Sequence, residues 1–206
     1  MNLKIMEDGK MHLNPSLLSV SELYKIISGA VSPRPIAWIS TVSKEGICNL
    51  APFSFFTVAS SEPPMICFSI GPGEGEREGK PKDTLTNISD THEFVFNFVP
   101  FNLIQAMEQS SKNYIPDVDE FNEIGVNQIK STIVKPPGVK ESPIQFECKL
   151  ENIVPLGKYQ LVIGKVVHIR LENEYYQNGK LNLIKLQPVG RLTGNYILVK
   201  DLYTLT

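Results

Sequence analysis

The chain has 206 residues, of which 42% are hydrophobic and 20% are charged, and this balance excludes a wholly disordered protein. The length suits a single domain spanning residues 1–206. The formal net charge of −2 argues against a phosphate backbone as partner, so we expect no nucleic acid. The segment 1–16 is charged without an apolar core, and apolar runs are too short for a membrane span. We therefore expect no signal peptide, no membrane partner and a cytoplasmic location.

One helix is predicted ahead of the first strand. Ser19 and Glu22 make a capping-box pair at the start of 19–27, where apolar residues recur at helical spacing. Gly29 is expected to end this helix.

Strands dominate the rest of the chain. Pro52 indicates an edge, bulge or bend in its strand, because proline cannot donate to a ladder. The last two strands are expected to pair as a hairpin. Apolar and β-branched runs predict strands at 36–42, 47–59, 65–70, 94–99, 144–153 and 159–171.

The remaining segments predict short helices and loops. Helices are expected at 83–89, with Asp83 as N-cap, and at 102–110. The segment 113–127 is polar and irregular, with at most one helical turn, and Pro188 and Gly190 indicate a turn in the tail. Since strands and helices do not alternate, the fold class is mainly β: an antiparallel barrel with a few helices.

Several familiar site patterns are missing from the sequence. The loop 71–82 has Glu76 where a dinucleotide fingerprint needs its third glycine, and Glu74 and Pro81 break a P-loop pattern. It reads as an acidic surface loop or as a lid over a ligand. The carboxylates of 117–123 read as a solvated face.

The cysteines and histidines form no metal-ligand or disulfide pattern, so we expect no metal site and a reducing compartment. No two cysteines make a C-x-x-C pair. The residues are Cys48, Cys67, Cys148, His12, His92 and His168.

Three segments carry candidate chemistry. In 32–41, Pro33 and Pro35 hold Arg34 in extended backbone, which suits a phosphate or carboxylate partner or a surface salt bridge. In 49–56, aromatic residues alternate with small ones beside Pro52, which fits a ligand wall or a bent core strand. In 80–88, Lys82 precedes a helix start, which fits an anion site or ordinary capping.

In this order and spacing, the three segments resemble the flavin reductase-like family with an FMN-binding split β-barrel, which includes flavoredoxins and NAD(P)H:flavin oxidoreductases. The resemblance covers 32–99 and resumes at 190–196. There Thr193 departs from the glycine usual in the family, and the segment 112–143 does not match.

The resemblance implies a set of site residues. Contacts along the isoalloxazine are expected from Asn49, Ala51, Pro52, Ser54 and Phe55. Contacts near the ribityl phosphate are expected from Ser40, Thr41, Lys82, Asp83 and Thr84. Arg34, Arg191 and Tyr196 are expected near the flavin or the dimer contact.

The resemblance also implies a homodimer with FMN at the subunit interface. The expected function is an FMN-dependent oxidoreductase that passes electrons from NAD(P)H to flavin, oxygen or a redox partner protein. The alternatives are an FMN-binding electron carrier without nicotinamide turnover, and a relative that holds another phosphate ligand such as pyridoxal phosphate. Because flavin supplies the redox chemistry, no catalytic acid, base or nucleophile is required from the protein. We expect Trp38, the one tryptophan, to lie near the cofactor.

Overall fold

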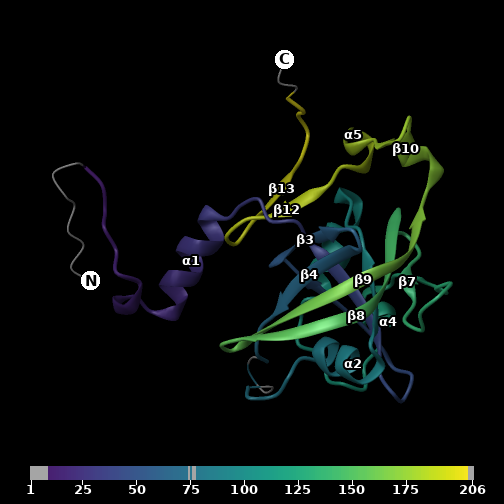
Figure 1. Cartoon of the computed structure of the whole chain (residues 1–206), viewed down its shortest axis with the longest axis horizontal. Coiled ribbons are helices and arrows are strands. Elements are labelled where there is room, and N and C mark those ends of the chain that lie inside the picture. Colours follow the sequence, from purple (N-terminus) through teal and green to yellow (C-terminus); the bar gives the residue numbers. More distant parts are fainter. Residues whose placement is uncertain (1–8, 74, 76–77, 204–206) are drawn as a thin grey trace.

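The computed structural model describes residues 9–73, 75 and 78–203, and strands predominate in it (Figure 1). The expectations for the segment 1–16 and for the loop 71–82 involve residues 1–8, Glu74 and Glu76, which lie outside the described residues. The helices are α1 (Val20–Ala30), α2 (Asp83–Thr91), α3 (Ile104–Gln109), α4 (Glu120–Ile124) and α5 (Leu183–Leu186), with 3-10 turns at Pro15–Leu17, Phe101–Leu103 and Asn173–Tyr175. The strands are β1 (Ala37–Val42), β2 (Cys48–Phe53), β3 (Phe56–Ser61), β4 (Pro64–Ile70), β5 (Glu93–Asn97), β6 (Gln128–Ile129), β7 (Gly138–Val139), β8 (Ile144–Leu156), β9 (Tyr159–Leu171), β10 (Tyr176–Gln177), β11 (Lys180–Leu181), β12 (Val189–Arg191) and β13 (Tyr196–Leu198).

The main sheet has seven antiparallel strands in the order β2-β1-β5-β8-β9-β4-β3. β2 and β3 are consecutive in sequence yet lie at opposite edges, so the chain crosses between the edges at Ser54 and Phe55. Pro52 lies in the edge strand β2, as its missing N–H predicts. The predicted long hairpin is confirmed as β8 and β9. The mainly β fold class is confirmed.

The strands curl around one apolar core. Phe68 of β4, Phe94 of β5 and Val162 of β9 are buried there with Ile39 of β1. Ile88 of α2 joins them, so this helix closes part of the barrel against β1, β2 and β5. Burial of these side chains from non-local strands holds the sheet in its curved form.

A second apolar cluster lies on the other face of β1 and β2. Because side chains alternate along a strand, Trp38 and Leu50 point away from the barrel core and pack on Met107 of α3 and Phe121 of α4. The Trp38 indole is fully buried, and its N–H donates to the Ser110 hydroxyl at 2.9 Å. Trp38 therefore lies inside the protein, as expected.

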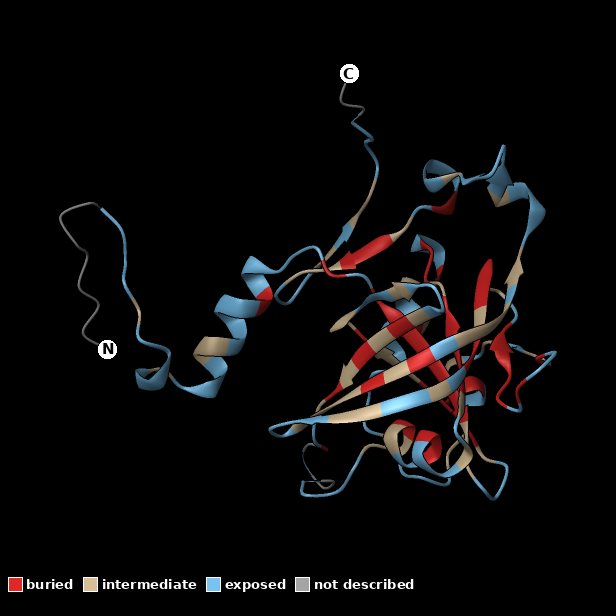
Figure 2. Ribbon diagram, viewed as in Figure 1, coloured by how far each residue is buried: buried red, intermediate tan, exposed pale blue. Residues whose placement is uncertain are grey.

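Helix α1 leaves the barrel and projects from it (Figure 1). The Ser19–Glu22 capping box is confirmed. Gly29 does not end the helix, which continues to Ala30. Gly29 does not adopt the left-handed backbone of a C-cap glycine, and Val31 is the C-cap instead. Much of α1 is exposed (Figure 2).

The tail forms a small hairpin of β12 and β13 rather than the predicted turn at Pro188 and Gly190. Gly190 lies inside β12, paired with Ile197, and a Cβ there would press on Pro33. The glycine thus serves close backbone approach, not a turn.

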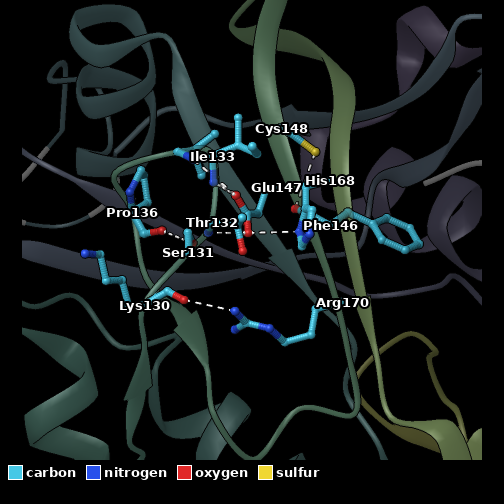
Figure 3. A network of polar contacts seen from close by, with 11 residues as sticks. Lys130, Ser131, Thr132, Ile133, Pro136, Phe146, Glu147, Cys148, His168 and Arg170 are labelled. Carbon is cyan, nitrogen blue, oxygen red and sulfur yellow. Dashed lines mark hydrogen bonds and ion pairs between the residues drawn. The ribbon is translucent and has the colours of Figure 1, made fainter.

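The segment 130–142 is fastened to the barrel by the Glu147 carboxylate of β8 (Figure 3). Glu147 accepts backbone N–H bonds from Thr132 (2.7 Å), Ile133 (2.6 Å) and Val134 (3.1 Å). His168 of β9 places Nδ1 3.1 Å from the same carboxylate. Burial alone would raise the pKa of Glu147, but the three N–H donors and His168 lower it below the ordinary value.

Cys48, Cys67 and Cys148 are free thiols. Within the described ranges, His, Cys, Asp and Glu side chains do not gather into a group that could hold a metal ion. None of the helices in that part of the chain has the length and apolar character needed to span a membrane.

Candidate functional site

A polar pocket of about 140 Å³ lies where β2 meets the start of α2, and we call it the anion pocket. The segment 110–114 and Glu120 of α4 also line it. It brings together six of the predicted site residues: Asn49, Ala51, Pro52, Lys82, Asp83 and Thr84.

The start of α2 supplies hydrogen-bond donors to this pocket. The helix begins at Asp83 with Lys82 as its N-cap, so the predicted N-cap role of Asp83 is wrong. Lys82 makes no side-chain capping bond, and its half-buried side chain lines the pocket instead. The first backbone N–H groups of a helix have no partner within it and carry the positive end of the helix dipole. Together with the Lys82 ammonium, they suit an anion.

Asn49 connects β2 to this helix start. Its side-chain amide lies 3.0 Å from the Thr84 hydroxyl and 3.3 Å from the Thr41 hydroxyl. Asn87 of α2 donates to the same Thr41 hydroxyl at 3.0 Å. All four side chains are buried, so Thr41 orients the pocket residues from behind rather than lining the pocket itself.

Ser40 lies on the opposite face of β1 from Thr41, because adjacent strand residues point to opposite faces. Its hydroxyl donates to the Pro137 carbonyl at 2.5 Å and accepts from Asn97 at 3.2 Å. The structure therefore does not bring the Ser40 hydroxyl to the anion pocket.

Glu120 is a pocket residue that the sequence did not predict, as are Phe53, Gly73 and the residues of 110–114. Glu120 is only 6% exposed, and its Oε2 accepts the Leu50 N–H at 3.2 Å. Burial raises the pKa of Glu120 to about 7, and the nearby charges of Asp83 and Asp119 add to the shift, while backbone N–H bonds oppose it. A carboxyl that is half protonated near neutral pH is a candidate functional group. The reading of 117–123 as a solvated face is wrong at this position.

A larger pocket of about 660 Å³ adjoins the anion pocket and has aromatic walls, so we call it the aromatic pocket. It contains the predicted Ser54 and Phe55, and it shares Pro52 and Lys82 with the anion pocket. Phe55 stacks on Tyr159 at 6.0 Å between ring centroids and lies 6.2 Å from the Tyr24 ring. Tyr24 of α1 and Tyr159 of β9 were not predicted, because each reads only as part of an apolar element.

A third pocket, of about 310 Å³, brings in the two predicted residues of the tail. The Arg191 guanidinium stacks 4.4 Å from the Tyr196 ring centre. The Tyr196 hydroxyl donates to the Glu108 carboxylate. Burial and this hydrogen bond raise the pKa of Tyr196. Pro52, Ser54 and Lys82 also line this pocket, so it adjoins both others.

Arg34 is buried, and its guanidinium bonds to backbone carbonyls of the protein. Its guanidinium donates to the carbonyls of Ser28, Val31 (3.2 Å) and Leu192 (3.3 Å). It thereby ties the end of α1 to the C-terminal hairpin. The side chain also lies 5.9 Å from the Phe55 ring centre. The expected surface salt bridge is wrong, because backbone carbonyls take the place of a carboxylate.

The three pockets join an end rich in hydrogen-bond donors, lined by Lys82 and Lys112 together with Asp83 and Glu120, to an aromatic end. Such an arrangement suits a flat ring system that carries an anionic tail: the tail meets Lys82, Thr84 and the helix N–H groups, and the ring lies beside Pro52 and Phe55.

Comparison with known proteins agrees with this geometry. Residues 29–185 match the model of the flavin reductase like domain. A protein of Halalkalibacterium halodurans is 40% identical over 191 residues, which are 90% of each chain. The crystal structure of nitrilotriacetate monooxygenase component B from Bacillus cereus superposes with a TM-score of 0.91 at 32% identity, covering 95% of this chain and 98% of that one. A split-barrel structure from Shewanella frigidimarina shares the fold, with a TM-score of 0.83 at 23% identity, covering 96% and 99%. The chain belongs to the flavin reductase-like family and has its split-barrel fold.

Proposed function

We propose that this protein is an FMN-dependent oxidoreductase that takes electrons from NAD(P)H and passes them to flavin, oxygen or a partner protein. The observation that carries the proposal is the junction of the anion pocket with the aromatic pocket at Pro52 and Lys82. A phosphate end and a ring end that adjoin in this way match the two parts of FMN.

The residues present fit the cofactor. Lys82, Thr84 and the first N–H groups of α2 would hold the phosphate, which could not be buried without such donors. Backbone groups of 51–55 at the sheet edge would face the ring. Bound FMN supplies the hydride and electron chemistry, and the protein supplies binding and orientation.

The absorption spectrum of the purified protein tests the cofactor, and stopped-flow mixing with NADH or NADPH tests the activity. The proposal expects a flavin band, or one acquired on adding FMN, that bleaches with NAD(P)H. A flavin band that NAD(P)H does not bleach would instead favour the electron-carrier alternative. A band typical of pyridoxal phosphate would contradict both.

We also propose that the protein is a homodimer. Val20, Ile27 and Val31 on and beside the projecting helix α1 are 86%, 56% and 62% exposed. An apolar helix surface of this kind is typical of an interface, and a second copy would cover it. Light scattering is expected to give twice the 23.0 kDa of one chain. Ile27→Asp should yield monomer, while Lys25→Glu on the same helix should not; a wild-type monomer at micromolar concentration would contradict the proposal.

FMN binding should quench the fluorescence of Trp38. Trp38 pairs with Pro52 across β1 and β2, and its indole bonds to Ser110, which lines the anion pocket. Because it is the sole tryptophan, the whole indole emission reports on this position. Titration of apo-protein with FMN is expected to lower the emission in proportion to binding. Unchanged emission at saturating FMN would place the flavin elsewhere.

A further inference from the structure

The Glu120 carboxyl and the Asn49 amide face each other in the anion pocket. The nearer Asn49 amide atom lies 3.1 Å from Glu120 Oε1. On its other side, the amide faces the hydroxyls of Thr84 at 3.0 Å and Thr41 at 3.3 Å. The Leu50 N–H lies 3.2 Å from the same side of the amide and 3.2 Å from Glu120 Oε2, so it has an acceptor in Glu120 whichever way the amide turns. A hydroxyl can donate or accept, and a carboxyl donates when protonated and accepts when ionised, so each state of Glu120 has its own orientation of the Asn49 amide.

With Glu120 neutral, its O–H donates to Asn49 Oδ1. Asn49 Nδ2 then donates to the oxygens of Thr84 and Thr41. The Thr84 hydroxyl accepts this bond and keeps its own hydrogen for another acceptor. It can therefore donate to an anion in the pocket.

With Glu120 ionised, the carboxylate needs a donor, and Asn49 turns its Nδ2 toward it. Asn49 Oδ1 now accepts from the hydroxyls of Thr84 and Thr41. The Thr84 hydrogen is used inside the protein, and the pocket gains a negative charge. Both changes disfavour a bound phosphate.

We propose that Glu120 and Asn49 are a positioning pair in which the Glu120 proton decides whether Thr84 donates to a bound phosphate or to the Asn49 amide. The inference rests on the proposed function, since it takes the FMN phosphate as the occupant of the anion pocket. Glu120 acts through Asn49 and Thr84 and need not touch the cofactor.

The surroundings of Glu120 set the pH range of this change. Desolvation and the acidic neighbours Asp83 and Asp119 favour the neutral form, and backbone N–H bonds favour the ionised form. The pKa of Glu120 is raised to about 7. The charged and titratable groups that face it are Lys82 and Asp83 at the start of α2, Asp119 of α4, Lys112 and Tyr114 of the segment before α4, and Cys48 of β2.

The test compares the affinities for FMN and riboflavin between pH 6.5 and 8.5, where the phosphate, with a second pKa of about 6, is already mostly dianionic. In the wild type, the ratio of FMN affinity to riboflavin affinity should fall about tenfold as Glu120 ionises, the change expected for one lost charge-assisted hydrogen bond. In Glu120→Gln the ratio should stay level or rise slightly with pH. The exposed Glu123→Gln, on the same helix, should behave as the wild type.

The outcomes separate this inference from the proposed function. A wild type that binds FMN and riboflavin equally at every pH would remove the phosphate site itself. If both proteins prefer FMN to riboflavin and the affinity ratio depends on pH in the same way in wild type and Glu120→Gln, the positioning pair is overturned. The phosphate site would still be supported by that result.

Two further measurements cover the case in which Glu120→Gln does not fold. Thr84→Val lacks the switched hydrogen, so its affinity ratio should fall less with pH than that of the wild type and keep only the part due to the Glu120 charge; a fall equal to that of the wild type would overturn the positioning pair. Calorimetry of wild type at pH 8 in buffers of different ionisation enthalpy should show proton uptake on FMN binding, because a bound phosphate favours neutral Glu120. Absence of uptake would also overturn the inference.

Discussion

Replacing Lys82 by alanine is expected to weaken FMN binding by about ten- to a hundredfold while leaving riboflavin binding nearly unchanged. Lys82 lines all three adjoining pockets and is the N-cap residue of α2. One charge-assisted hydrogen bond contributes about 1.5–3 kcal/mol, which gives the expected loss. Riboflavin lacks the phosphate and so does not use the bond. Fluorescence titration of both flavins measures the two affinities.

Lys80→Ala is the matched control, since Lys80 is an exposed lysine two residues away that lies outside the anion pocket. It should change neither affinity. Because Lys82 makes no side-chain capping bond, its removal should leave α2 intact. An equal loss of FMN and riboflavin affinity in Lys82→Ala, or no loss of either, would place the phosphate elsewhere.

Replacing Glu147 by glutamine is expected to lower the free energy of unfolding. The carboxylate accepts three backbone N–H groups of the segment 130–142, and an amide presents only one oxygen to them. Each buried N–H left without an acceptor costs about 1–3 kcal/mol. Urea unfolding at pH 7 should show this loss in the free energy of unfolding. Glu151→Gln, at an exposed position of the same strand, should show little change.

The difference between wild type and Glu147→Gln should also depend on pH. The folded-state pKa of Glu147 lies below its ordinary value of 4.5. Its contribution is therefore fully present above about pH 4.5 and is lost as the pH falls through the folded-state pKa. The difference in the free energy of unfolding between wild type and Glu147→Gln should therefore shrink as the pH falls. A gap that stays constant down to the acid transition would show that Glu147 does not act through its charge.

The fold could be predicted from the sequence where a local pattern decides it. The apolar runs gave the long hairpin of β8 and β9, and the capping box gave the start of α1. The ends of elements were less predictable, because distant contacts set them. Gly190, for example, pairs with Ile197 inside β12, where its backbone lies too close to Pro33 to leave room for a Cβ.

Some residues of the candidate site could likewise be predicted from the sequence, and others could not. Lys82, Asn49 and Pro52 lie near one another in the folded chain, as their family pattern implies. Ser40 differs because strand alternation turns its hydroxyl to the other face. The burial of Glu120 could not be predicted from the local sequence. Helix α4 has little more than one turn, and its buried side is set by contact with β2, which is distant in sequence.

The crossing at Ser54 and Phe55 joins the two free edges of the main sheet, and it is also a wall of the aromatic pocket. The Phe55 carbonyl accepts the Ser69 N–H of β4 at 2.8 Å, so this short link connects the β2 edge with the β3–β4 edge. A ligand seated there would bind only the folded form and would raise the free energy of unfolding by mass action. Backbone amides of both edge strands should then exchange with deuterium more slowly together, although β2 and β3 share no ladder. Binding of the cofactor and closure of the barrel would therefore be thermodynamically coupled.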